Sequence, residues 1–157
     1  AVGPKSIEEL LELKSPLSVP FILKGIMNAK TALAAIEAGA DAIVVSNHGG
    51  RVMDAMPGTA EVLPEIANAV AGRVKILVDG GVREGIDILK MLALGADAVM
   101  IGRPICIAAF GAAQEGVEFY LDQKRSELKK AMILTGCADI NHIDPSIIVR
   151  GSKGQLH

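Results

Sequence analysis

Short apolar runs rich in branched residues recur along this chain and alternate with stretches in which apolar residues have helical spacing. Such runs, bounded by glycine and polar residues, are typical of strands buried on both faces, as the strands of parallel sheets are. The pattern predicts four strands, at residues 21–23, 42–45, 76–78 and 98–101.

The stretches between the strands predict helices over residues 28–38, 59–70 and 85–94. Asn28 is a suitable N-cap for the first of them, and Gly39 and Gly95 stand where helix C-caps belong. Before the first strand, Ser6-Ile7-Glu8-Glu9 has the capping-box pattern of a further helix. Strands that alternate with helices require right-handed crossovers, so the sequence predicts an α/β fold with a parallel sheet.

An internal repeat indicates which kind of α/β architecture the chain adopts. AGADAIVVS at 38–46 realigns with LGADAVMIG at 94–102, an offset of 56 residues between Gly39 and Gly95. Two βα units fit in this offset, and each copy places Gly-Ala-Asp-Ala at a helix-to-strand corner, where glycine ends the helix. Regular βα units build (β/α) barrels, whereas the GxGxxG turn that usually opens a doubly wound sheet is missing from this sequence.

The chain is too short for a whole barrel. A closed eight-stranded barrel needs roughly 200 to 250 residues, but the chain has 157 residues and four predicted strands. We therefore expect one domain over residues 1–157, half of a barrel, with residues 151–157 as a flexible polar tail. Since the chain begins with Ala, we expect it to be part of a longer protein. An N-terminal half-barrel or a second copy, forming a homo-oligomer, would cover the two unpaired sheet edges.

Composition limits the classes of partner. The residues are 50% hydrophobic and 22% charged with a net charge of −2, which excludes a disordered chain. No apolar run reaches the roughly 18 residues of a membrane span. Residues 1–14 contain two lysines and three glutamates where a signal peptide would have an apolar core. We therefore expect a cytoplasmic protein without a membrane partner. Without a basic stripe and with 3% aromatic residues, the chain lacks the features of nucleic-acid binders. Small molecules are the expected ligands.

The two cysteines suggest neither a disulfide framework nor a metal site. Cys106 and Cys137 lie far apart and outside any CxxC spacing. We expect both to be small buried hydrophobic residues. The charged stretch 118–130 predicts a solvated helix face, and His142 is expected to be a structural loop residue.

Polar residues follow every predicted strand, which is where barrel enzymes build their active sites. The glycine-rich third and fourth loops each run into a helix, and such loops commonly bind phosphate through backbone N–H groups. Arg83 and Arg103 would add bidentate contacts. The spacing predicts a phosphate-bearing ligand faced by a lysine and a histidine. The polar segments are Lys24-Gly25, 46–51, 79–83 and 102–104.

Together the segments FILKGI, VSNHGGR, LVDGGVREGIDILKMLALGADAV and IGRP resemble the FMN-dependent α-hydroxy-acid oxidase and dehydrogenase family. This family includes glycolate oxidase, lactate oxidase and flavocytochrome lactate dehydrogenase. The resemblance extends from about Ser6 to Ile140 and implies the C-terminal half of a TIM (β/α)8 barrel, with FMN as cofactor. SNHGGR is its most specific element. Val52 stands where the family usually has glutamine, a departure that bears on substrate preference.

The resemblance implies roles for the residues that react with substrate. Lys24 resembles the family lysine beside N1 and O2 of the flavin, where a fixed cation stabilises the reduced ring. His48 resembles the catalytic base, a task that suits a side chain titrating near neutrality. Arg51 resembles the arginine whose planar fork binds the substrate carboxylate, with His48 beside it.

Further residues are implied to bind the cofactor. Ser46 resembles the residue hydrogen-bonded to the flavin ring, and Asp79 resembles the acceptor of a ribityl hydroxyl. The resemblance implies no metal ligands. It implies a phosphate-binding site formed by Gly81, Arg83, Gly102 and Arg103.

The function implied is oxidation of a small (S)-2-hydroxy acid, of the lactate or glycolate type, to the 2-oxo acid. One alternative is a non-catalytic half-barrel that binds flavin or phosphate. Another is a different FMN barrel enzyme, a type 2 isopentenyl-diphosphate isomerase or a relative of inosine monophosphate dehydrogenase. SNHGGR argues against the isomerase, and the lack of a catalytic cysteine loop argues against the latter. Since the family's His-orienting aspartate belongs to the N-terminal half, we expect the isolated chain to be inactive.

Overall fold

The computed structural model describes residues 3–149 and contains a four-stranded parallel sheet. The strands are hydrogen-bonded in chain order, β1-β2-β3-β4, and every neighbouring pair is parallel. The predicted sheet is therefore confirmed. Its strands are β1 (Ile22–Ile26), β2 (Ala42–Val45), β3 (Lys75–Val78) and β4 (Ala98–Val99).

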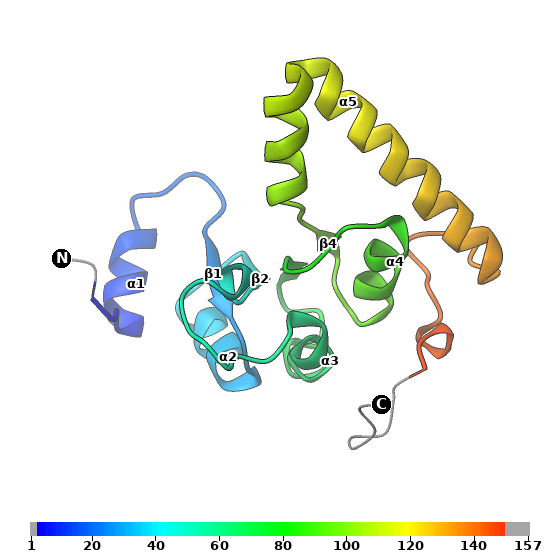
Figure 1. Cartoon of the computed structure of the whole chain (residues 1–157). Coiled ribbons are helices and arrows are strands. Elements are labelled where there is room, and N and C mark those ends of the chain that lie inside the picture. Colours follow the sequence, from blue (N-terminus) through cyan, green and yellow to red (C-terminus); the bar gives the residue numbers. More distant parts are fainter. Residues whose placement is uncertain (1–2, 150–157) are drawn as a thin grey trace.

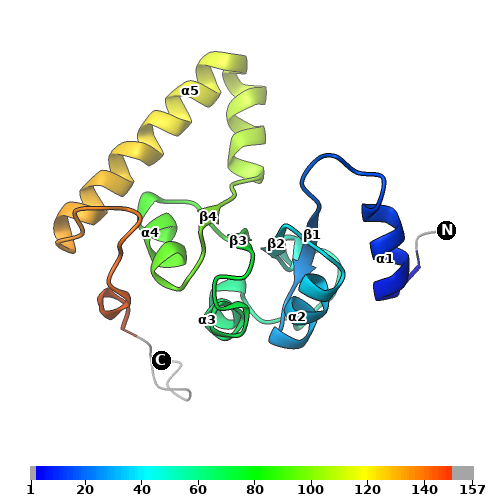
Figure 2. The same ribbon diagram turned by 180° about the vertical axis from the view of Figure 1, so that it is seen from behind.

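A helix precedes β1 and a helix follows every strand, as the alternating pattern predicts (Figures 1 and 2). Helices α2 and α3 lie side by side, and α4 packs against α5. Two short 3₁₀ turns lie outside these helices, at His48–Gly50 and Pro145–Ile147. The helices are α1 (Ile7–Lys14), α2 (Ala29–Glu37), α3 (Thr59–Val70), α4 (Gly85–Ala93) and α5 (Arg103–Leu134).

Local capping chemistry explains where the first helices begin and end. Ser6 and Glu9 form a reciprocal capping box, and the side-chain Oδ1 of Asn28 accepts the Thr31 N–H at 2.8 Å. Gly39 and Gly95 follow the ends of α2 and α4 with φ of +75° and +108°. Glycine adopts this left-handed conformation without a steric penalty. The predicted caps are confirmed.

The repeated Gly-Ala-Asp-Ala segment ties neighbouring strands together at their starts. The main-chain N–H of Asp41 donates to the Phe21 carbonyl and its carboxylate accepts the Phe21 N–H, both at 2.8 Å. Asp97 makes the same pair of bonds with Ile76, at 2.8 and 2.9 Å. The Phe21 N–H and Lys14 hold the pKa of Asp41 below its usual value. The repeat is thus a strand-start clamp, at the end of the sheet opposite the polar loops.

The core lies between the sheet and the helices that cover it. All four β2 residues are buried, and Leu63 and Ile66 of α3 are fully enclosed. The expectation that every strand is buried on both faces is wrong for the two edge strands, since Ile22 of β1 is 47% exposed and Ala98 of β4 is exposed. Among the described residues each edge strand has one neighbouring strand, so its other side is open.

Helix α5 contains a sharp bend, visible in both views as two arms that meet at an angle (Figures 1 and 2). Ala112 and Ala113 have non-helical dihedral angles there. On the longer arm the expectation of a solvated face is wrong at Lys124, which is buried, ion-paired with Glu127 at 2.7 Å and 5.2 Å from the ring centroid of Tyr120. Pairing with a carboxylate and an aromatic face makes burial of the ammonium tolerable.

The cysteines also differ from expectation. Cys106 is exposed in the first turn of α5, and Cys137 is partly exposed because it follows the end of that helix. The predicted tail at 151–157 lies outside the described residues. Within the described residues, none of the helices is both long and apolar enough to cross a membrane, and no cluster of three metal-binding side chains is found.

Candidate active site

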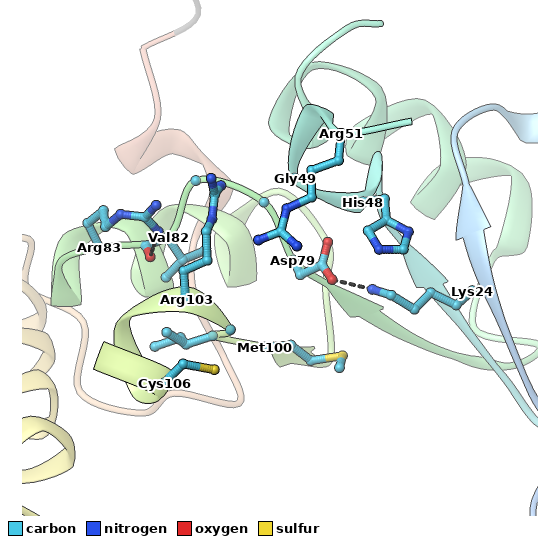
Figure 3. A pocket seen from close by; sticks show the side chains of 14 residues that line it. Lys24, His48, Gly49, Arg51, Asp79, Val82, Arg83, Met100, Arg103 and Cys106 are labelled. Atoms are coloured by element: carbon cyan, nitrogen blue, oxygen red, sulfur yellow. Dashed lines mark hydrogen bonds and ion pairs between the residues drawn. The ribbon is translucent and has the colours of Figure 1, made fainter. Parts of the chain in front are cut away.

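The carboxyl ends of the four strands open into one pocket of about 320 Å³ (Figure 3). Lys24 and His48 lie at one end of it, Arg83 and Arg103 lie at the other, and Asp79 lies between them. Ser46 is buried behind the lining. The fold thus brings together residues that are up to 79 positions apart, as Lys24 and Arg103 are. The predicted site residues in the lining are Lys24, His48, Arg51, Asp79, Gly81, Arg83, Gly102 and Arg103.

Lys24 reaches the pocket from within β1 because the strand is irregular at Gly25. The pairing with β2 passes from Lys24 opposite Val44 to Ile26 opposite Val45, so Gly25, with φ of +97°, is the extra residue of a bulge. The Lys24 ammonium donates to the Ser46 hydroxyl at 3.0 Å and forms an ion pair with the Asp79 carboxylate. These contacts fix a positive charge where β1, β2 and β3 meet.

The loop between β2 and α3, residues 46–58 and hereafter the β2–α3 loop, presents His48. The buried Ser46 hydroxyl accepts the main-chain N–H of His48 at 3.1 Å, besides the bond from Lys24. His48 has φ of +57°, and Gly49 and Gly50 continue in the left-handed region. Such a conformation is costly for a residue with a side chain and is concentrated at functional sites. It leaves the imidazole exposed in the pocket.

Three guanidinium groups give the pocket its charge. None of Arg51, Arg83 and Arg103 forms an ion pair with a described residue. Arg83 donates to the Val82 carbonyl at 2.9 Å, and Arg103 lies 3.3 Å from the position that a Cβ on Gly49 would take. With Lys24 the lining holds four cations and one carboxylate, although the whole chain has a net charge of −2. The pocket therefore favours an anionic ligand.

The backbone donors for an anion are unevenly distributed between the two glycine-rich loops. The first N–H groups of α4 are occupied, since those of Arg83 and Glu84 donate to Asp87 at 3.0 Å and that of Gly85 donates to Glu127 at 2.8 Å. In contrast, the N–H groups of Gly81, Val82 and Gly102 make no hydrogen bond in the described part of the chain. An anion can therefore be bound by N–H groups of the loop that follows β3 and by Gly102 before α5, but not by the occupied N–H groups at the start of α4.

A buried acceptor indicates a second property of the ligand. Asp79 Oδ1 is buried without a hydrogen-bond partner among the described residues, while Oδ2 pairs with Lys24. Buried carboxylate oxygens normally have a donor, because leaving one unmatched is costly. A ligand with hydroxyl groups next to an anionic end would supply that donor and occupy the cationic end of the pocket. The chemistry of a phosphorylated polyol fits both features.

Comparison with known proteins identifies the family. A family model described as FMN-dependent dehydrogenase matches residues 3–150. The chain belongs to this family. A 2-hydroxyacid oxidase of Dictyostelium discoideum is 50% identical over 140 residues, which cover 89% of this chain and 36% of that protein. An L-lactate oxidase of Lactobacillus jensenii is 48% identical over 146 residues, 91% of this chain and 35% of that protein.

Solved structures agree with this assignment. Mandelate oxidase crystallised with benzoyl-formic acid is similar with a TM-score of 0.83 and 43% identity, covering 88% of this chain and 41% of that chain. The predicted fold, the C-terminal half of an FMN-dependent TIM barrel, is confirmed. The chain spans about two fifths of the length of the relatives that it matches. FMN, the cofactor of this family, has the phosphate and the hydroxyl groups that the pocket fits.

Sequence reasoning missed several residues of the pocket and its surroundings. Val82, Met100 and Cys106 line the pocket, but their apolar or small side chains gave no chemical signal. Asn47 lies inside the SNHGGR segment, and Thr59 was noted only as the start of a helix. A polar residue at the first position of a helix that follows a strand-end loop is the signal that could have singled out Thr59.

Proposed function

We propose that this chain is the cofactor- and substrate-binding half of an oxidoreductase that converts a small (S)-2-hydroxy acid to the 2-oxo acid. The convergence of Lys24, His48 and Arg51 beside a cationic anion-binding site is the observation that carries the proposal. FMN, when bound, accepts the two electrons that the substrate loses. The names of the relatives, 2-hydroxyacid oxidase and L-lactate oxidase, support a small hydroxy acid as the substrate.

His48 acts as the base in this proposal. Its imidazole is exposed in the pocket, and its main chain is fixed by the buried Ser46 hydroxyl. A histidine can accept a proton near neutral pH, which is what removal of a proton from the hydroxy acid requires. The held main chain limits the positions that the ring can reach, so the proton acceptor is oriented before substrate binds.

Arg51 binds the carboxylate of the substrate. It stands three residues after His48 in the same loop, and no described carboxylate pairs with it. A guanidinium binds a carboxylate through two parallel hydrogen bonds, which fixes the orientation of the acid as well as its position. The hydroxyl-bearing carbon is thereby placed next to the imidazole.

Lys24, Ser46 and Asp79 hold the ring and ribityl parts of the cofactor. The ammonium, fixed by both other side chains, supplies positive charge for the reduced ring. The unpartnered Asp79 Oδ1 accepts a ribityl hydroxyl. Arg83 and Arg103, at the opposite end of the pocket, would bind the phosphate together with Gly81 and Gly102 of the lining.

The barrel is completed by further strands in this proposal. Within the described residues the sheet has two unpaired edges, and apolar side chains are exposed beside both: Val19 and Ile22 at β1, and Ile107 and Phe110 in α5 beyond β4. Unpaired parallel edges with apolar flanks are normally covered. An N-terminal half-barrel, or a second copy of the chain, would cover them and provide a partner for His48.

A cytoplasmic location stays a prediction.

One experiment separates this enzyme from a non-catalytic flavin-binding half-barrel. The chain, combined with an N-terminal half-barrel from a homologous oxidase, is loaded with FMN without oxygen and mixed with (S)-lactate or glycolate. We expect bleaching of the flavin absorbance, no bleaching with (R)-lactate and none in His48→Ala. Binding of FMN without reduction by any 2-hydroxy acid would contradict the proposal and support the binding module.

A further inference from the structure

Two loops that carry different parts of the site meet at Thr59. They are the β2–α3 loop and the loop between β3 and α4, residues 79–84, hereafter the β3–α4 loop. Thr59 is the first residue of α3 and is 3% exposed. Its hydroxyl donates to the main-chain carbonyl oxygen of Asp79 at 2.6 Å. The end of the β2–α3 loop is thereby bonded to the start of the β3–α4 loop.

The approach of the two loops excludes a side chain at Gly80. Gly80 has φ of +104°, and a Cβ there would lie 2.9 Å from the Thr59 hydroxyl oxygen and 3.5 Å from Asn47 Oδ1. A separation below 3.0 Å is not tolerated by real Cβ atoms unless the neighbour moves. The glycine is therefore required by its conformation and by the closeness of Thr59.

Asn47, near the start of the β2–α3 loop, also lies beside Gly80. Its amide nitrogen donates to the Pro57 carbonyl at 3.3 Å and closes the loop, while Oδ1 is buried facing Gly80. Neither Asn47 nor Thr59 lines the pocket. We call Asn47, Thr59 and Gly80 the inter-loop brace. Its two polar side chains each donate a hydrogen bond to a main-chain carbonyl of a loop, while Asn47 Oδ1 has no partner among the described residues.

The inter-loop brace is needed because the main-chain hydrogen bonds of the sheet end before the loop residues that line the pocket. The β2–β3 pairing ends with Val45 opposite Val78, and the last main-chain bond runs from the Asp79 N–H to the Val45 carbonyl at 3.1 Å. Beyond that bond, the Thr59 hydroxyl makes the next direct hydrogen bond between the two loops, while Lys24 joins them indirectly by contacting both Ser46 and Asp79. It thus lies between the residues that bind substrate and those that bind the ribityl chain and phosphate.

We propose that Thr59 is a positioning residue that sets the spacing between the β2–α3 loop and the β3–α4 loop, and so between the base and the cofactor. The inference rests on the proposed function for the identity of the ligands. Reacting groups must be held to within a few tenths of an ångström, and loops achieve this only when other contacts lock them. The hydroxyl of Thr59 supplies such a lock through one buried bond.

The test uses the full chain and three substitutions. Thr59→Val keeps the shape and removes the hydroxyl, and Thr59→Ser restores it. Thr31→Val is the matched control, because the Thr31 hydroxyl also bonds a main-chain carbonyl at a helix start but is exposed and outside the pocket. The first measurement is ligand-free, the amide chemical shifts of Gly80, Gly81 and His48. The second is the dissociation constant for FMN.

We expect Thr59→Val to shift the amide signals of both loops and to weaken FMN binding by about five- to tenfold, the equivalent of one lost hydrogen bond. Thr59→Ser should retain both properties, and Thr31→Val should change neither. A purely structural hydroxyl would lower stability but leave the affinity of the folded protein unchanged. If Thr59→Val does not fold, Thr59→Ala is measured in the same way.

The outcomes distinguish the inference from the proposed function. Unshifted His48 signals together with wild-type FMN affinity in Thr59→Val would overturn the positioning role and leave the proposed function standing. Amide shifts in both loops, with no FMN binding by any form of the chain, would support the brace and contradict the proposed function. An equal loss in Thr59→Ser would also overturn the inference, since serine keeps the hydroxyl.

Discussion

Removing the Arg103 guanidinium tests whether the cationic end of the pocket binds a phosphate. Arg103 is the first residue of α5 and has no ion pair among the described residues, so its fork is available to a ligand without breaking another contact. A charge-assisted hydrogen bond contributes about 1.5–3 kcal/mol. Because about 1.4 kcal/mol is a tenfold change in an equilibrium constant, Arg103→Ala should weaken FMN binding by roughly 10- to 150-fold.

Arg83 should show a smaller loss for a physical reason. Its guanidinium already donates to the Val82 carbonyl at 2.9 Å, so a phosphate contact would replace this neutral bond rather than add to free donors. Subtracting about 1 kcal/mol for the bond given up leaves about 0.5–2 kcal/mol, or roughly two- to thirtyfold. The expected order of effect is therefore Arg103→Ala above Arg83→Ala.

The assay is titration of the chain into FMN, followed by quenching of flavin fluorescence. Riboflavin, which lacks the phosphate, is the matched ligand, and its affinity should be the same in wild type and Arg103→Ala. Arg73→Ala is the matched protein control, because Arg73 bonds the Val70 and Ala69 carbonyls at the end of α3 and lies outside the pocket. Equal losses for FMN and riboflavin in Arg103→Ala, or none for either, would refute the phosphate assignment.

Three other predictions concern stability and assembly. Burial raises the pKa of Asp97, but Lys75 and the Ile76 N–H outweigh it and hold the pKa below the usual value. The ionised Asp97 carboxylate therefore stabilises the folded chain. This stabilisation is present above the pKa of Asp97 in the unfolded chain, about 4, and is lost as the pH falls through the lower pKa that Asp97 has in the folded chain. Asp97→Asn should thus lower the free energy of unfolding, measured with urea at pH 7, by about 1–2 kcal/mol. The cost is no larger because the carboxylate is 38% exposed and its charge is partly screened. Below pH 4 the difference in stability between wild type and Asp97→Asn should shrink. Gly85→Ala should destabilise by about 1–3 kcal/mol, since its Cβ would overlap Leu128 N, whereas Gly111→Ala, with open space, should not. Light scattering should find the lone chain associated, and a stable monomer would contradict the assembly proposal.

The elements and the position of the site could be predicted because both depend on short stretches of sequence. A capping box at Ser6 and a glycine at position 39 act over a few residues, and polar residues at the ends of parallel strands meet wherever the sheet forms. Burial could not be predicted in the same way. Ile22 is exposed because β1 has no outer neighbour within the described residues, and Lys124 is buried on the part of α5 that packs against the start of α4.

The brace at Thr59 was beyond sequence reasoning for a related reason. A threonine at a helix start is explained locally as a cap, and nothing in the neighbouring residues indicates a bond to a carbonyl 20 positions away. The start of α4 shows the same limit. Its glycine-rich approach resembles an anion site, yet a distant carboxylate, Glu127, takes the Gly85 N–H. Long-range side-chain bonds of this kind decide which of several similar loops can accept a ligand.

The two ends of the sheet have separate tasks: side chains at the strand starts bond the main chain, and side chains at the strand ends form the cationic site. At the strand starts, Asp41 and Asp97 satisfy neighbouring main-chain groups and are paired with lysines. At the strand ends, Lys24 alone is ion-paired among the cations of the pocket, and Arg51 and Arg103 lack a carboxylate within the described residues. Clustered guanidiniums repel one another, so the fold must be held by contacts elsewhere. The Asp41 and Asp97 clamps provide these contacts at the opposite end of the sheet. Binding of an anionic cofactor and an anionic acid should stabilise the chain by more than the ligands' own hydrogen bonds, because each ligand also relieves the repulsion between the guanidiniums.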